Sequence, residues 1–178
     1  MNRIPPLVRV PLRYGLIGGA VGSLAIAVLY ALGKHPFLLP IIVDFRIILF
    51  AVFIFFSLRE LRDQWLSGLL FFWQGMVASY VFIVSCGLVG GIFTWGLARW
   101  NDAFIPSYIE KLQAQMLTYK SEIVQSVGAE AYQQQLAKLP GTTALDLAGD
   151  YFLKSLIIGL FLAIVISVIL RKTPPNPN

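Results

Sequence analysis

The apolar residues of this chain are gathered into long runs that short polar segments separate. Residues 14–33 carry no formal charge over twenty positions, which is the length that an α-helix needs to cross about 30 Å of hydrocarbon. Comparable runs follow at 36–57, 66–98 and 151–170. The third run exceeds one bilayer crossing, so we expect it to tilt, kink or protrude. The pattern predicts an all-α protein with one membrane domain, an integral membrane four-helix bundle.

Helix boundaries carry signals of their own. We expect the second helix to begin at Pro36, with Pro36 and Pro40 in its first turns, where a missing amide hydrogen costs little. Ahead of the last run, Thr143 offers an N-cap and Asp146 its capping-box partner. Residues 173–178 are proline-rich, and we expect a flexible tail there.

The segment 99–148 is polar, yet its apolar residues are regularly spaced. One stripe recurs every three or four positions and predicts an amphipathic helix. Its members are Ile105, Ile109, Leu112, Met116, Tyr119 and Ile123. Gly128 interrupts the pattern, and a second, shorter helix is expected over 129–139. We interpret the segment as an amphipathic helical hairpin that packs on itself or on the bundle, and the alternative is a docking surface for a partner protein.

Basic residues in the short loops predict the orientation of the bundle. They fall on one side of the four expected spans and mark that side as cytoplasmic. These residues are Arg3, Arg9, Arg13, Arg59, Arg62, Arg171 and Lys172. Both termini are therefore expected in the cytoplasm, with the segment 99–148 on the outside. Among the aromatic residues, Trp65 is expected at the inner boundary, and Trp95, Trp100 and Tyr151 at the outer one.

Composition agrees with a membrane protein and narrows the chemistry. Hydrophobic residues make up 57% of the chain, charged residues only 13%, and mean hydropathy is +0.74. The excess of basic residues follows the loop pattern, so it indicates membrane topology and no nucleic-acid partner. The single cysteine and single histidine form no metal-ligand spacing, and we expect His35 to be an interfacial turn residue. No catalytic motif is found, so we expect no enzyme, cofactor or metal.

Four ionisable residues lie within or beside the apolar runs. Asp44 and Arg46 belong to the second run, and Asp150 and Lys154 stand at the start of the fourth. An unpaired charge in the membrane costs about 2.5–3.5 kcal/mol even on lenient scales. We therefore expect two crossed pairs, Lys154 with Asp44 and Asp150 with Arg46. Such a charge cluster sets helix register in one interpretation and handles protons or solutes in the other.

Small residues form ladders at helical spacing. In lipid, such ladders let helix backbones approach closely. In the first run they are Gly15, Gly19 and Ser23, with Gly18 and Gly22 alongside, and in the third run they are Gly87 and Gly91. We interpret them as packing seams within one bundle, with a contact between copies of the chain as the alternative.

Several motifs in this order resemble one known family. They are RYGLIGGA at 13–20, LRELRD at 58–63, WLSGLLF at 65–71 and IPSYIEKL at 105–112. Together they resemble the membrane-protein family catalogued as domain of unknown function 4199, found mainly in Bacteroidetes. The chain departs from it with Gln-Trp-Leu-Ser after Asp63, where a more polar, glycine-containing turn is expected. The resemblance implies a fold, an inner-membrane location and a periplasmic hairpin, but no catalytic residues.

Two functions remain open at this point. The first is a non-enzymatic structural or accessory subunit that holds a partner membrane protein, or a second copy of itself, within the lipid bilayer. The alternative is a small carrier or channel component, working as an oligomer, in which Asp44, Arg46 and Lys154 line a polar path.

Overall fold

A computed structural model describes residues 4–38 and 44–173. In these residues the fold is all-α, and its only β-type pairing is an antiparallel bridge between Leu70 and Lys172. The helices are α1 (Pro6–Ala31), α2 (Phe45–Glu60), α3 (Phe72–Trp100), α4 (Phe104–Thr118), α5 (Lys120–Val127), α6 (Ala129–Lys138) and α7 (Ala144–Leu170). Shorter helical pieces are η1 (Pro36–Leu38), η3 (Leu61–Trp65) and η4 (Leu139–Gly141). Pro40 and nearly all of the expected tail lie outside the described residues.

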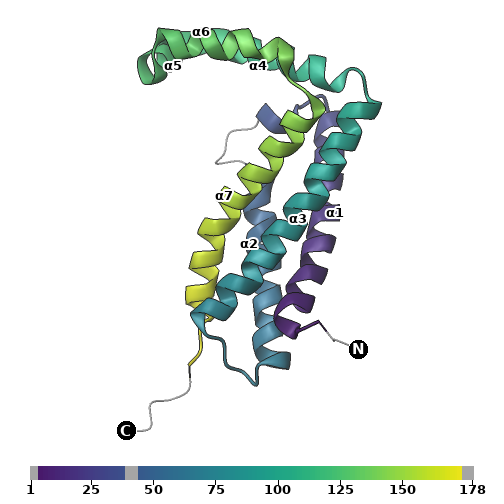
Figure 1. The fold of residues 1–178 in the computed structure, drawn as a ribbon, viewed down its shortest axis with the longest axis vertical. Helices are drawn as coiled ribbons and strands as arrows, with labels where there is room; N and C mark the ends of the chain where they lie inside the picture. Colours follow the sequence, from purple (N-terminus) through teal and green to yellow (C-terminus); the bar gives the residue numbers. More distant parts are fainter. Residues whose placement is uncertain (1–3, 39–43, 174–178) are drawn as a thin grey trace.

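Four long helices, α1, α2, α3 and α7, lie side by side, and α4, α5 and α6 lie across one end of them (Figure 1). The start of α1 and the end of α7 are at the opposite end (Figure 1). Helix α3 makes the most extensive contacts, with α7 on one side and α1 on the other. Helices α1, α3 and α7 are each long and apolar enough to cross a membrane.

Close contacts fix the direction of each helix. Gly15 and Gly19 of α1 lie against Ser85 and Val89 of α3, so these two helices run in parallel. Glu60, the last residue of α2, accepts a hydrogen bond from Arg13 near the start of α1. Leu49, near the start of α2, lies close to Gly22 farther along α1. Helices α1 and α2 are therefore antiparallel. Helices α3 and α7 are also antiparallel, because Gly75 lies against Ser167 and Gly91 against Ala148.

The second helix begins later than its apolar run. We expected a start at Pro36, but Pro36–Leu38 forms only the short helix η1, and α2 starts at Phe45. The cause is local, because the Asp44 carboxylate accepts a hydrogen bond from the Arg46 amide and so caps the helix. Asp44 therefore stands at the helix start and not two turns inside it.

The third and fourth helices also differ from their apolar runs. Helix α3 starts at Phe72 and not at 66, because Ser67 and Gly68 adopt φ values of 53° and 80° that a helix cannot continue through. Helix α7 starts at Ala144, before 151, and carries the expected capping box of Thr143 and Asp146. The capping prediction is confirmed.

The segment between α3 and α7 is helical throughout most of its length. The expected long helix is broken at Tyr119 into α4 and α5. Gly128, with φ of 87°, separates α5 from α6, as its position in the pattern predicted. The hydroxyl of the buried Tyr132 on α6 donates to the carbonyl of Met116 on α4 at 3.4 Å. This hydrogen bond joins α6 to α4.

Candidate functional site

Arg46 is the centre of a buried polar cluster near the end of the bundle that carries α4. Its residue surface is only 6% exposed. The guanidinium Nε donates to both carboxylate oxygens of Asp44, at 2.9 and 3.0 Å, and its Nη2 also pairs with Asp44. A two-pronged Arg–carboxylate pair of this kind combines charge neutralisation with a fixed geometry.

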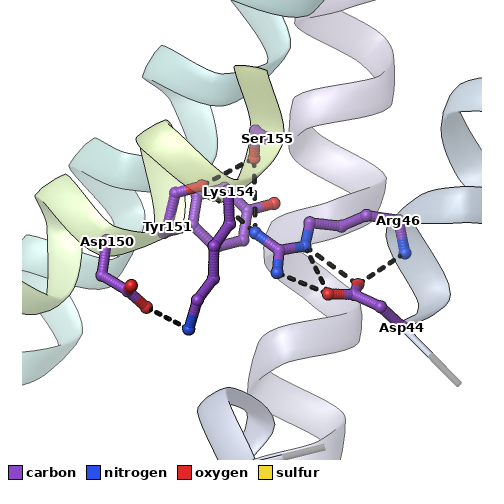
Figure 2. A network of polar contacts seen from close by, with 6 residues as sticks. All are labelled: Asp44, Arg46, Asp150, Tyr151, Lys154 and Ser155. Atoms are coloured by element: carbon purple, nitrogen blue, oxygen red, sulfur yellow. Dashed lines mark hydrogen bonds and ion pairs between the residues drawn. The ribbon is translucent and has the colours of Figure 1, made fainter. Parts of the chain in front are cut away.

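Helix α7 supplies the remaining partners of Arg46. The guanidinium Nη1 donates to the Tyr151 carbonyl at 3.1 Å and to the Ser155 hydroxyl at 3.5 Å. Its carbon lies 4.8 Å from the centre of the Tyr151 ring, a cation–π contact. Figure 2 shows Asp44 on one side of the guanidinium, and Tyr151 with Ser155 on the other. Arg46 thus joins the start of α2 to α7.

The expected crossed pairs are wrong. Lys154 pairs with Asp150 of its own helix at 2.7 Å, and Arg46 pairs with Asp44. Figure 2 shows two separate pairs. Asp44 and Arg46 are two residues apart and would point to different sides of a helix. They meet because Asp44 is the extended N-cap residue and its side chain can fold back over the first turn.

Two glycines make room for the Tyr151 side chain. A Cβ atom at Gly90 of α3 would stand 2.3 Å from Tyr151 Cε1, and one at Gly22 of α1 would stand 3.3 Å from the Tyr151 hydroxyl. The ring therefore reaches between α1 and α3. We expected Tyr151 in an aromatic belt at the membrane boundary, but it is only 3% exposed. Sequence reasoning missed its role and that of Ser155; the only available signal was the pair of small residues Gly22 and Gly90, which leave room for a large side chain.

The chemistry open to this cluster is limited. Each guanidinium nitrogen has an acceptor, and Asp44 is occupied by Arg46 and by the helix cap. The cavity beside Arg46 and Tyr151 has a volume of about 10 Å³, room for no more than one water molecule. No group of residues suited to hold a metal ion occurs in the part of the chain that the structure describes. The arrangement is that of a neutral clamp.

The small-residue ladders lie at contacts between helices of one chain. Gly15 and Gly19 face α3, and Gly87 and Gly91 face α7. Gly18 lies near Phe53 and Phe82, and Gly22 near Tyr151. Ser23 is buried, and its hydroxyl donates to the Gly19 carbonyl.

The apolar stripe of the segment 99–148 is mostly turned inward. Met116 is buried, whereas Ile105, Ile109, Leu112 and Ile123 are half-buried. Tyr119, at the break between α4 and α5, is exposed. Between the start of α4 and the end of α6, the exposed large apolar side chains are Leu117, Val127 and Tyr119, the last of which belongs to the stripe.

A second polar contact lies at the other end of the bundle. The Arg13 guanidinium donates to both oxygens of Glu60, and the Tyr14 hydroxyl donates to the same carboxylate at 2.9 Å. It joins the start of α1 to the end of α2. Arg13 is 59% exposed here, so the pair contributes less than the buried one.

His35 is buried and not at the surface of its turn, contrary to expectation. Its ring centre lies between 4.8 and 6.1 Å from the rings of Phe104, Tyr108, Phe37 and Tyr30. Neither ring nitrogen has a hydrogen-bond partner in the described residues, although the Phe104 backbone lies nearby. Burial, together with the Lys111 ammonium, lowers the His35 pKa to about 4.

We expect the protein to lose stability as pH falls through the range in which His35 titrates. Because its folded pKa is about 4 and its ordinary value 6.5, the unfolded chain binds the proton first. The contribution of His35 to the free energy of unfolding is at its full value above pH 6.5. It falls by up to about 3 kcal/mol as the pH is lowered towards 4. Thermal unfolding in detergent from pH 4 to 7 measures this loss. In His35→Phe the decline should be smaller, and equal declines in both proteins would contradict the assignment.

The model of one protein family, described as Protein of unknown function (DUF4199), matches residues 13–172. The match therefore covers nearly the whole chain and includes every residue of the Arg46 cluster. Comparisons with curated proteins and with solved structures gave no match.

Proposed function

The chain belongs to the DUF4199 family of proteins of unknown function, and from that premise we propose that it is a non-enzymatic, multi-pass protein of the inner membrane. Its role in this proposal is that of a structural or accessory subunit of a membrane complex. The bundle anchors the protein, and the segment α4–α6 holds the partner on the periplasmic side.

The parallel course of α1 and α3 supports four membrane crossings. If α1 and α3 cross the membrane in the same direction, the chain between them must cross back in the opposite direction. Helix α2 lies in the bundle between them in sequence and can make this crossing (Figure 1). With 16 residues, α2 is about 24 Å long, a little under the hydrocarbon thickness. Asp44 at its start then lies near the outer boundary, where a paired charge is least costly.

The observation that carries the accessory role is the contrast between the closed bundle and the open segment α4–α6. Inside the bundle, Arg46 is fully paired and the adjacent cavity has a volume of about 10 Å³. Outside it, α4 to α6 extend across the end of the bundle and expose Leu117, Tyr119 and Val127. In the proposal, these exposed side chains are the surface that the partner protein covers.

Photo-crosslinking in living cells tests this role. A photoreactive phenylalanine analogue at Tyr119 should yield a discrete protein adduct of defined mass. The same analogue at Leu160, which is exposed on α7, is the matched control and should yield none. If positions 117, 119 and 127 all give no protein adduct, the accessory role is abandoned.

The second candidate function, a small carrier or channel component, is favoured by the buried hydroxyls of the interior. Ser57, Ser79, Ser167 and the Tyr151 hydroxyl are buried and lack hydrogen-bond partners in the described residues. An oligomer would be needed, because this bundle encloses little volume. Loss of a solute flux in a well-folded Asp44→Asn protein would favour this function over the first.

Cysteine labelling tests the topology of the proposal. The natural Cys86 is buried, so new cysteines at the exposed Gln125 and Gln64 report alone. Gln125→Cys should react with an impermeant maleimide added to the periplasm, and Gln64→Cys should react only after the inner membrane is opened. The reverse pattern would invert the orientation, and reaction of both from outside would exclude the four crossings.

A further inference from the structure

An apolar groove runs along the surface of the bundle where α3 and α7 meet. Its volume is about 300 Å³, at the lower end of the range for ligand pockets. It exists because the helices meet through small residues, and a Cβ at Gly87 would already stand 3.1 Å from Phe152. Farther out, Gly149 faces open space, where a Cβ would meet nothing within 4 Å. Two helices packed this closely leave a furrow beside their contact.

The walls of the groove are apolar and open to the surroundings. Ile92 and Trp95 form the α3 side, and Leu145 and Phe152 the α7 side. Leu145 is 71% exposed and Ile92 67% exposed. In the proposed membrane position this face meets lipid, so close packing against the groove walls holds a bound acyl chain, with no hydrophobic gain over the surrounding bilayer.

Helical spacing places a cation one turn beyond Trp95, the last α3 residue that lines the groove. Leu88, Ile92, Trp95 and Arg99 follow one another at intervals of four, three and four, which places them on one face of α3. Arg99 is exposed and forms no ion pair with any carboxylate among the described residues. The acid next to Leu145, Asp146, is held by the Thr143 cap. Arg99 lies in the last turn of the 29-residue helix α3, and in the proposed membrane position this turn stands beyond the hydrocarbon.

We propose that this groove binds a phospholipid, with one acyl chain between α3 and α7 and the phosphate at Arg99. The inference rests on the proposed membrane position of the bundle. An apolar furrow that ends at an unpaired guanidinium matches the two parts of a phospholipid, and arginine is well suited to bind phosphate. Trp95 lines the groove at the level between these parts, a position at which indole rings are favoured.

Native mass spectrometry of the detergent-purified protein tests the site, with phosphatidylethanolamine and a diacylglycerol of the same chains as probes. Gly149→Leu adds a bulky side chain to the wall of the groove at a position where a Cβ would meet no atom within 4 Å. It should reduce retention of both lipids about tenfold, because the acyl chain loses its packing contacts with the groove walls. Val165→Phe, on an exposed part of α7 outside the groove, is the control and should change neither.

Arg99→Gln tests the phosphate contact separately. It should reduce retention of phosphatidylethanolamine about tenfold and leave diacylglycerol unchanged. Equal retention of phosphatidylethanolamine by the wild type and Gly149→Leu would overturn the proposal. A dimer that Gly149→Leu dissociates would overturn it as well, because the groove would then hold a second copy. Recovery of the chain from the aqueous fraction after an alkaline carbonate wash would instead refute the membrane position itself.

Discussion

Replacing Asp44 with asparagine should lower the free energy of unfolding by about 3 kcal/mol. Asparagine is as good an N-cap as aspartate, so the start of α2 is preserved and only the charge is lost. Arg46 then remains buried without its counter-charge, and a lone buried cation is far costlier than a paired one. Unfolding in mixed micelles of a mild detergent and dodecyl sulfate measures the change.

Two comparisons isolate the ion pair as the cause. Asp150→Asn breaks the more exposed pair with Lys154 and should cost less than about 1 kcal/mol. The double variant Asp44→Asn/Arg46→Met removes both charges, so its loss should be smaller than the sum of the two single losses. Strict additivity, or a loss in Asp44→Asn no larger than in Asp150→Asn, would show that the pair does not act as a buried clamp.

Gly90→Ala should cost about 1–3 kcal/mol, although it adds only one methyl group. The new Cβ would stand 2.3 Å from Tyr151 Cε1, and the ring is enclosed by α1, α3 and α7. Either the ring leaves Arg46 or α3 and α7 move apart. The same micelle assay measures the loss.

Gly149→Ala is the matched control for Gly90→Ala. It adds the same methyl group to a helix of the bundle, but into open space, and alanine has the higher helix propensity. It should leave stability unchanged or raise it by up to about 1 kcal/mol. A Gly90→Ala protein as stable as Gly149→Ala would mean that Tyr151 does not fill the space between α1 and α3.

Features that depend on neighbouring residues could be predicted from the sequence. The capping box of Thr143 and Asp146 and the break at Gly128 follow from local backbone chemistry, and both are present. The start of α2 could not be predicted from hydrophobicity, because the apolar run begins before the helix does. The residue that marks the true start, the N-cap Asp44, lies inside this run.

Features that depend on which helices face one another could not be predicted in this way. The charges at 44, 46, 150 and 154 were recognised, but their partners follow from helix rotation, which one sequence leaves open. Tyr151 and His35 are amphipathic side chains suited equally to an interface and to a core. Their burial depends on residues far along the chain, Gly90 for the first and Phe104 for the second.

The partners of Arg46 on α7 are synthesised last, because α7 is the final helix of the chain. A nascent chain releases its first three long helices well before α7, and at that stage Arg46 has Asp44 but neither the Tyr151 carbonyl nor the Ser155 hydroxyl. A polypeptide cut short before residue 144 keeps a guanidinium whose Nη1 lacks both of its acceptors on α7. The polar contacts of Arg46 are therefore completed only when the last long helix of the chain has been made.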